Sequence, residues 1–426
     1  MLDLLIHNGT AITVNDRSEI LPNAVICIKD GKITDLYSRP DSDSVSRAGS
    51  DAHSGTSPAS LPETRERLDA DGGLILPGLI NAHTHLPMSL FRGLADDLPL
   101  DEWLNEHIFP AEAARINPET VYEAAMLSCT ELLQSGVTTC CDGYFHEEHV
   151  ARAVKDAGLR AVLGQGIIDF PAPGVPDPAR NIAAAEAFIQ SIMDLSPRIT
   201  PSVFCHSPYT CSENTLKSAK SLADRYGLLF QVHLAETRWE RDRTLAEYGM
   251  GPARHLASLG ILDERTLLVH CVWLKKEDIQ IVADTGASVI HCPESNMKLG
   301  SGVAPVPEMI RSGIPVGIGT DGCASNNDQD MFREMDMTAK LHKVFSGDPT
   351  VMDAETVLRT ATIDGARAIG LGAETGSLEK GKRADIIILD ADAVHLTPMY
   401  HPVSHIVYAA RGADVKNTIA GGEKLL

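Results

Sequence analysis

Residues 74–85 read Leu74-Ile75-Leu76-Pro77-Gly78-Leu79-Ile80-Asn81-Ala82-His83-Thr84-His85, an apolar run that ends in two histidines one residue apart. Successive side chains of a strand point to opposite faces, so His83 and His85 share a face and Thr84 takes the other. Two imidazoles on one face can hold a divalent metal ion, but two ligands alone hold it poorly. The sequence therefore predicts further ligands elsewhere in the chain.

Three later apolar runs also end in residues that bind metals. Val232 is followed by His233, Val269 by His270, and Gly319-Thr320 by Asp321. An enzyme built as a barrel, with its site at the carboxyl rim of the strands, requires strands that end in this way. Asp321 could instead cap a helix, because Asp-Gly also marks a turn, and His83 and His85 could be ordinary core histidines.

The central region contains eight apolar runs, each followed by a polar loop and usually by a helical pattern. The expected strands are Leu79–His85, Val137–Asp142, Ala161–Gly166, Thr200–Phe204, Leu229–His233, Leu267–His270, Ser288–His291 and Val316–Asp321. Helices are expected at Pro118–Gln134, Ser212–Tyr226, Lys275–Asp284 and Ala354–Ile369. This alternation predicts an α/β protein with a (β/α)8 TIM-like barrel. A doubly wound open sheet is the alternative, but no GxGxxG motif follows a strand.

Both ends of the chain are rich in short strand patterns. They are Leu4–Ile6, Ala11–Val14, Ala24–Ile28 and Lys32–Leu36 at the start, with turns at Asn8-Gly9 and Asp30-Gly31, and Ala384–Leu389, His405–Tyr408 and Val415–Ile419 at the end. We expect a small β-sandwich built from both termini, in residues 1–72 and 376–426, around a barrel in residues 73–375.

Residues 41–66 are rich in Ser, Asp, Ala and Pro and contain few large apolar side chains. Such a segment cannot bury enough surface to offset the entropy lost on ordering. We expect a flexible insertion in the small domain, with His53 exposed and without function.

Composition excludes several classes of protein. The 426 residues are 43% hydrophobic, which is typical of a globular chain. A net charge of −21 argues against nucleic acid or an anionic membrane as a partner. No apolar run approaches the ~20 residues of a membrane span, and the first residues resemble a strand, not a signal peptide. The nine cysteines lack a CxxC pair, and their odd number together with the absence of a secretion signal favours a reducing cytoplasm.

Two further residues are candidates for the chemistry. Glu236 follows His233 by three residues, in the loop above the strand, where a carboxylate can reach a metal-bound water without ligating the metal. The alternative is a solvated loop glutamate. His270 could be a fourth nitrogen ligand, or it could hydrogen-bond the water and the developing charge.

The motifs together resemble one family. They are Pro77–His85, Arg92–Leu98, Glu102–Leu104, Cys205–Tyr209, His233–Thr237, His270–Val272, Pro293–Gly300 and Gly319–Asn327. This set is similar to the amidohydrolase superfamily, in its mononuclear aminohydrolase branch, and most specifically to the 5′-methylthioadenosine/S-adenosylhomocysteine deaminases. The resemblance covers essentially the whole chain except Pro40 to Arg67.

The resemblance implies roles at the matching positions. His83, His85, His233 and Asp321 would bind one Zn²⁺ per chain, with Fe²⁺ or another divalent metal as alternatives, and no organic cofactor. Glu236, His270 and Asp321 would be catalytic. The substrate-binding set would comprise Glu112 and His206 at the ribose, with Glu236, Trp103, Arg180 and Gln165. From the residues alone, Glu112 is only an acidic residue at a helix start.

One position departs from the family pattern. Some members carry an arginine after the third strand that can pair with the homocysteine carboxylate, whereas this chain has Gln165 there. Arg180 could match a second such arginine. Loss of one charged donor could remove about 1.5–3 kcal/mol of carboxylate binding, which favours the uncharged methylthio substituent.

The expected reaction is metal-dependent hydrolytic deamination of 5′-methylthioadenosine to 5′-methylthioinosine with release of ammonia, in purine salvage. S-adenosylhomocysteine and adenosine are further expected substrates. A homo-oligomer is a possible state of the protein that the sequence leaves open. In the alternative, the same chemistry acts on another heterocycle, and the protein is an aminohydrolase or chlorohydrolase of guanine, triazines or pterins. A ligand-binding protein on an inactive barrel is a different class, against which the intact ligand set and Glu236 argue.

Overall fold

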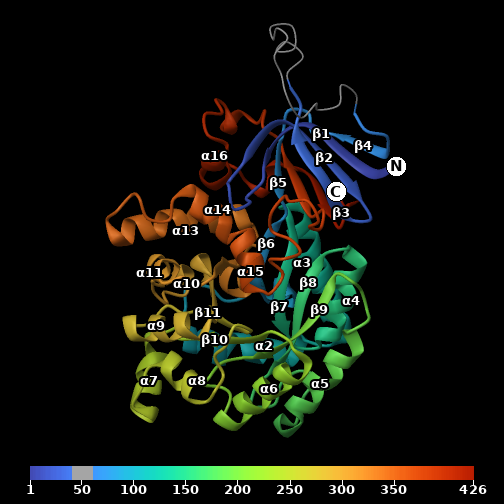
Figure 1. Cartoon of the computed structure of the whole chain (residues 1–426). Coiled ribbons are helices and arrows are strands. Elements are labelled where there is room, and N and C mark those ends of the chain that lie inside the picture. The colour runs from blue at the N-terminus through green and yellow to red at the C-terminus, as the bar shows by residue number, and fades with distance from the viewer. Residues whose placement is uncertain (41–60) are drawn as a thin grey trace.

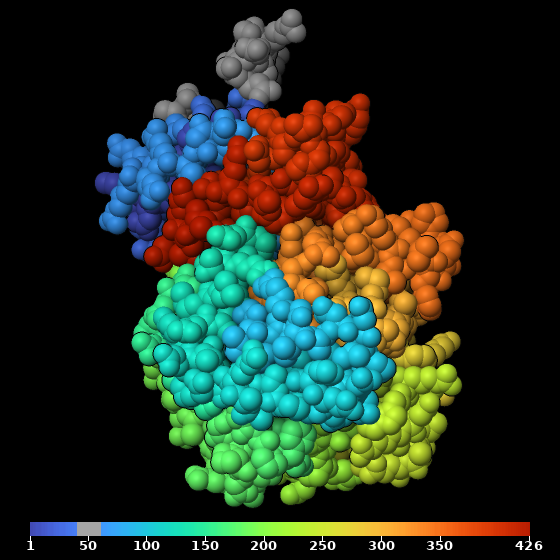
Figure 2. All heavy atoms as spheres, turned by 180° about the vertical axis from the view of Figure 1, so that it is seen from behind, coloured from blue at the N-terminus to red at the C-terminus, as the bar shows by residue number. Residues whose placement is uncertain are grey.

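The computed structural model describes residues 1–40 and 61–426 and divides them between a mixed sheet and a barrel (Figure 1). The sheet collects strands from both ends of the chain, and the barrel occupies the middle. Seen from behind, the first and last segments lie side by side at one end of the molecule (Figure 2). The expectation of a barrel with a small domain built from both termini is confirmed.

Eight parallel strands form the barrel in sequence order. They are β6 (Leu79–Thr84), β7 (Val137–Tyr144), β8 (Arg160–Ile167), β9 (Ile199–Cys205), β10 (Phe230–Leu234), β11 (Thr266–His270), β12 (Ser288–His291) and β13 (Val316–Ile318). The last strand meets the first through a bridge between Thr84 and Asp321, where the Asp321 N–H donates to the His83 carbonyl at 3.1 Å. All eight expected strands are therefore present, and the chain closes beside the predicted ligands.

The helices that follow the strands surround the barrel. They are α3 (Pro118–Gln134), α4 (Glu147–Ala157), α5 (Asn181–Ile192), α6 (Glu213–Tyr226), α7 (Arg238–Tyr248), α8 (Pro252–Ser258), α9 (Lys276–Thr285), α10 (Pro293–Lys298), α11 (Val306–Arg311), α12 (Cys323–Asn326) and α13 (Met331–Ser346). Between β6 and α3 lie η1 (Leu86–Phe91), α1 (Leu100–Glu102), η2 (Trp103–Ile108) and α2 (Phe109–Arg115). This excursion brings Trp103 and Glu112 over the carboxyl rim.

The expected single helix over residues 354–369 is wrong. The structure has two helices, α14 (Ala354–Thr360) and α15 (Ile363–Ala368), separated at Thr362, whose φ of −134° and ψ of −104° are not helical. The Ala361 carbonyl accepts from the Ile80 N–H at 2.8 Å. In a continuous helix this carbonyl would instead accept from an N–H group of the next turn. The chain turns there, and α15 packs against β6 and β13.

The terminal sheet runs in the order β16-β15-β14-β5-β1-β2-β3, with β4 also paired to β1. Its strands are β1 (Leu2–Ile12), β2 (Ile20–Lys29), β3 (Lys32–Ser38), β4 (Thr64–Asp69), β5 (Leu74–Pro77), β14 (Ile386–Leu389), β15 (Val415–Ala420) and β16 (Glu423–Lys424). Because β5 pairs with both β1 and β14, it joins the two ends of the chain. The chain enters the barrel at Gly78, where a Cβ would lie 2.1 Å from the Thr138 hydroxyl.

Three local predictions in this domain are corrected. Asn8-Gly9 does not separate two strands: β1 continues through it with an irregular register, and Asn8 takes a φ of 61°. The expected strand His405–Tyr408 is part of helix α16 (Pro402–Tyr408), which begins with Pro402 and is capped by His401. Residues 64–66 of the expected insertion belong to β4. Residues 41–60, with His53, lie outside the described residues.

All nine cysteines are buried and unpaired, including the five that lie in or beside apolar runs, Cys140, Cys141, Cys205, Cys271 and Cys292. Among the described residues, no helix is long and apolar enough to cross a membrane.

Candidate active site

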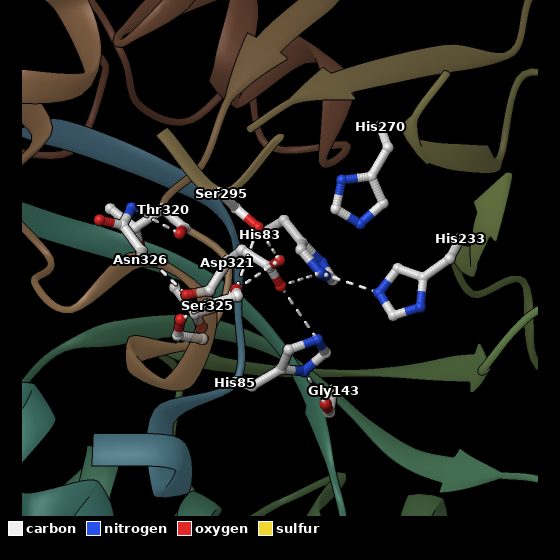
Figure 3. Close-up of polar contacts among 12 residues, drawn as sticks. His83, His85, Gly143, His233, His270, Ser295, Thr320, Asp321, Ser325 and Asn326 are labelled. Carbon is white, nitrogen blue, oxygen red and sulfur yellow. Dashed lines mark hydrogen bonds and ion pairs between the residues drawn. The ribbon is translucent and has the colours of Figure 1, made fainter. Parts of the chain in front are cut away.

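Three histidines and one aspartate converge at the carboxyl rim of the barrel (Figure 3). His83 and His85 come from the end of β6, His233 from β10, and Asp321 from the loop after β13. The Nε2 atoms of His83 and His233 lie 3.1 Å apart. Asp321 Oδ1 lies 3.5 Å from the Nε2 of His83 and 3.3 Å from that of His85. All four side chains are buried.

Neighbouring groups fix the orientation of these side chains. His85 Nδ1 is 2.7 Å from the Gly143 carbonyl, so that nitrogen donates its proton and Nε2 keeps a lone pair. The other carboxylate oxygen of Asp321 accepts from the hydroxyls of Ser295 at 2.7 Å and Ser325 at 3.0 Å. Supports of this kind, behind the ligands, are typical of metal sites in proteins.

The four residues fit a divalent cation. Their candidate ligand atoms all lie within 4.8 Å of one another, and three imidazole nitrogens with one carboxylate oxygen suit zinc. Burial lowers the pKa of His83 to about 4, so its lone pair is free at neutral pH. Burial alone would raise the pKa of Asp321, but hydrogen bonds with His83 and His85 hold it well below its usual range. Burial also lowers the pKa of His233, whereas the hydrogen bond and charge of Asp321 outweigh burial and raise the pKa of His85 to about 9. The group thus offers two neutral imidazoles and an ionised carboxylate, and a bound cation would replace the proton on His85.

Glu236 lies beside this group without belonging to it. Its side chain is buried, and burial, followed by the charge of Asp321, raises its pKa to about 8. The carboxyl group therefore keeps a proton at neutral pH. Such a carboxylic acid next to a metal-ligand set can act as a general acid.

The loop that carries Glu236 is held by a second buried glutamate. The carboxylate of Glu240, on α7, accepts from the backbone N–H groups of Ala235 at 2.8 Å and Glu236 at 3.0 Å. Ala235 has a φ of 52°, a conformation that a non-glycine residue adopts only when its surroundings impose it. Glu240 therefore sets the position of the Glu236 backbone relative to His233.

His270 ends β11 with a φ of 73° and faces the same space. Its Nδ1 lies 3.1 Å from the Asn296 side-chain nitrogen, and its Nε2 lies 3.8 Å from a Glu236 oxygen. It does not belong to the four-residue ligand group found among the described residues. Of the two roles left open by the sequence, this position favours contact with the water or the substrate.

Three adjoining cavities surround the ligand group, and Leu104 lines all of them. The innermost, about 60 Å³, is bounded by His85, His233 and Asp321 of the ligand group and by Glu236, His270, His206 and Trp103. A side chamber contains Glu112 and Tyr144, whose hydroxyl donates to Glu112 Oε1 at 2.5 Å. An outer vestibule of about 720 Å³ carries aromatic side chains, among them Phe109, Phe170 and Trp273. The structure thus brings Glu112, His206, Trp103 and Glu236 together.

Two predicted substrate contacts are not at these cavities. Gln165 faces the helix layer: its side-chain oxygen accepts from the Glu147 N–H at 3.2 Å, and it lines a separate cavity with His146 and Glu148. The next residue, Gly166, lines the Glu112 chamber, so strand alternation turns Gln165 outward. Arg180, at the end of η3 (Pro178–Arg180), is exposed.

The sequence did not single out Tyr144, Glu240 or Ser325. A signal existed for Glu240, because Thr237-x-x-Glu240 has the form of a capping box at the start of α7. In the structure Thr237 caps the helix, but the glutamate binds the preceding loop instead of the cap residue. Tyr144 carried no signal, since it ends an apolar strand like many tyrosines.

Comparison with known proteins gives consistent matches. The model of the amidohydrolase family matches residues 74–425. A 5-methylthioadenosine/S-adenosylhomocysteine deaminase of Syntrophobacter fumaroxidans is 43% identical over 424 residues, covering 100% of this chain and 93% of that protein. A 5′-deoxyadenosine deaminase of Methanothermobacter thermautotrophicus is 46% identical, covering 84% and 83%.

Among solved structures, an adenosine deaminase from Xanthomonas campestris with bound zinc is similar, with a TM-score of 0.91 and 36% identity. The match covers 99% of this chain and 92% of that one. The family match extends over most of the chain and includes each of the four converging residues, so this protein is a member of the amidohydrolase family.

Proposed function

We propose that this protein is a metal-dependent deaminase of adenine nucleosides, with 5′-methylthioadenosine as its preferred substrate. One observation carries the proposal: a buried His-His-His-Asp group, the protonated Glu236 and the buried Glu112 border one set of adjoining cavities. Relatives that are 43% and 46% identical are named as deaminases of adenine nucleosides, which supports the same reading.

His83, His85, His233 and Asp321 would hold one Zn²⁺, with Fe²⁺ or another divalent ion as alternatives. Such an ion lowers the pKa of a bound water toward ~7 and so supplies the nucleophile at neutral pH. The residues around it move the protons. Asp321 accepts a proton from the water, while Glu236, which starts protonated, donates to ring nitrogen N1 as the water oxygen bonds to C6.

The tetrahedral carbon then loses the amino group. The proton held by Asp321 passes to the amino nitrogen, which leaves as ammonia, and the ionised Glu236 takes the proton of the C6 hydroxyl. Both carboxyl groups thus regain their starting state, and the base becomes the corresponding hypoxanthine. One water is consumed for each ammonia released. His270, 3.8 Å from Glu236 and hydrogen-bonded to Asn296, would contact the water or the purine.

The Glu112 chamber favours a substrate that carries ribose. Glu112 is the only buried residue of α2, and a buried carboxylate requires hydrogen-bond donors. The 2′- and 3′-hydroxyls of ribose supply two donors, and His206 lines the same chamber. The remaining walls include Phe145, Gly166 and Ile168, which are uncharged and suit a methylthio group better than an ionised amino-acid tail.

The alternative substrates guanine, triazines and pterins lack this diol. They would use the same metal chemistry but leave the acceptor sites of Glu112 that Tyr144 does not fill without a donor in an apolar chamber. A steady-state ammonia assay on 5′-methylthioadenosine, adenosine, guanine, a triazine and a pterin distinguishes them. Turnover confined to the nucleosides supports the proposal, and turnover of a heterocycle without ribose at equal kcat/KM overturns it.

The compartment can be inferred from the cysteines. All nine are unpaired and buried in the structure. Thiols persist in this state where glutathione and thioredoxin keep proteins reduced. We therefore place the enzyme in the cytoplasm, with a role in purine salvage.

A further inference from the structure

Tyr144 is the last residue of β7, and its hydroxyl lies in the chamber beside Glu112. The hydroxyl donates to Glu112 Oε1 at 2.5 Å, and both side chains are only 4% exposed. Glu112 is the only buried residue of the seven in α2. The contact therefore joins the barrel to the helix that covers it.

Among the described lining residues, no lysine or arginine pairs with this carboxylate. Apart from Glu112 and Tyr144, the titratable groups among the described lining residues are His85 and His206. His85 donates to the Gly143 carbonyl and directs its other nitrogen at Asp321, and His206 hydrogen-bonds Thr210 at 2.9 Å. The Tyr144 hydroxyl is thus the group that orients Glu112.

We propose that Tyr144 is a positioning residue that holds Glu112 for recognition of the ribose 2′,3′-diol and so sets the preference for ribonucleosides. This inference rests on the proposed function. A carboxylate offers about four lone-pair sites, of which Tyr144 takes one, and the rest stay available to two hydroxyl donors. Without Tyr144, the terminal torsion of Glu112 is broad and the carboxylate has no fixed orientation.

The orientation also depends on which partner donates. Burial and the neighbouring Glu112 raise the pKa of Tyr144 well above its usual value, so the phenol keeps its proton and donates. Glu112 then acts as acceptor toward both Tyr144 and the sugar. Removal of the phenol would therefore weaken the contacts between Glu112 and the ribose hydroxyls. The contacts of the adenine base with Glu236 and the metal ligands would be unchanged.

The test compares adenosine with 2′,3′-dideoxyadenosine, which lacks both hydroxyls. In Tyr144→Phe the ratio of kcat/KM for adenosine to that for dideoxyadenosine should fall by about tenfold, the low end for a hydrogen bond to a charged group. Dideoxyadenosine turnover and metal content should stay within about twofold. Glu112→Gln should lower the same ratio, and adding Tyr144→Phe to it should cause no further loss, because the two residues act as a unit.

Tyr122→Phe is the matched control, because it removes the same atom from a tyrosine on α3 whose hydroxyl donates to Asp156 at the surface. It should leave the ratio unchanged. An unchanged ratio in Tyr144→Phe, or an equal loss on both nucleosides, would overturn the inference while leaving the deaminase function intact. A wild-type enzyme that releases no ammonia from either nucleoside would instead overturn the proposed function itself.

Discussion

His83 and His233 are 150 residues apart in the chain, yet their Nε2 atoms face each other at 3.1 Å. Each ring approaches from a different strand of the barrel, and the rings stand at 89° to one another. At most one proton can lie between these two facing nitrogens, so at least one of them presents a lone pair. The pair also lies beside the Asp321 carboxylate. A divalent cation satisfies all of these lone pairs at once.

The first prediction concerns metal content. Purified protein should contain one equivalent of a divalent metal per chain, because the described residues include one buried group of four ligands. Elemental analysis measures this directly. His233→Ala should reduce the bound metal sharply during dialysis against a chelator. Two equivalents, both needed for activity, would show that the site is not mononuclear.

Glu236→Gln should abolish turnover while retaining the metal. Glutamine has nearly the same shape but cannot deliver a proton, and loss of a general acid or base typically costs ~10² to 10⁴ in rate. Steady-state kinetics and elemental analysis on the same preparation check both halves of the prediction. Wild-type kcat in this variant would exclude Glu236 as the proton shuttle.

Glu240→Gln should lower kcat by about tenfold and leave metal content unchanged. The amide keeps one acceptor oxygen but loses the second, so one of the N–H groups of Ala235 and Glu236 becomes unsatisfied at a cost of about 1–3 kcal/mol. Glu247→Gln, on the exposed face of the same helix, is the control and should have wild-type kinetics. Equal kinetics in both variants would mean that the Glu240 contact does not position the acid.

Activity on ribonucleosides should depend on the protonation of Glu112. Burial raises its pKa to about 7, although the Tyr144 hydrogen bond opposes the shift. Above a pH of about 7 the ionised carboxylate accepts from both sugar hydroxyls. Below this pH the protonated carboxyl group cannot accept from both. Consequently kcat/KM for 5′-methylthioadenosine should fall as the pH drops through about 7. Glu112→Gln should lose this limb of the profile, and a variant that keeps it would assign the limb to another group.

The barrel and its ligands could be predicted because both depend on local patterns. Apolar runs that end in His83, His233 and Asp321 indicate where strands end. Parallel strands of a barrel bring their carboxyl ends to one rim. The contact between Tyr144 and Glu112 could not be predicted, because it depends on how α2 folds back over the barrel. The position of Gln165 has a local cause: it alternates with Gly166 along β8, so it lines a separate cavity while Gly166 lines the chamber.

The helix α16 and the long strand β1 show a similar limit. Residues 405–408 are apolar enough for a strand, but Pro402 and the cap at His401 start a helix that packs on α13 and α14. At Asn8-Gly9 the sequence has the form of a hairpin turn, yet β1 pairs with β2, β4 and β5, and this pairing favours a bulge over a turn. Tertiary contacts decide both segments.

The most direct test of the central claim is the reaction of the zinc-reconstituted protein with 5′-methylthioadenosine. Ammonia release and the purine product should be measured together, alongside S-adenosylhomocysteine. We expect one ammonia and one 5′-methylthioinosine per substrate, with kcat/KM about tenfold above that for S-adenosylhomocysteine, a ratio equivalent to ~1.4 kcal/mol. Failure of the folded, metal-loaded protein to release ammonia from 5′-methylthioadenosine would contradict it.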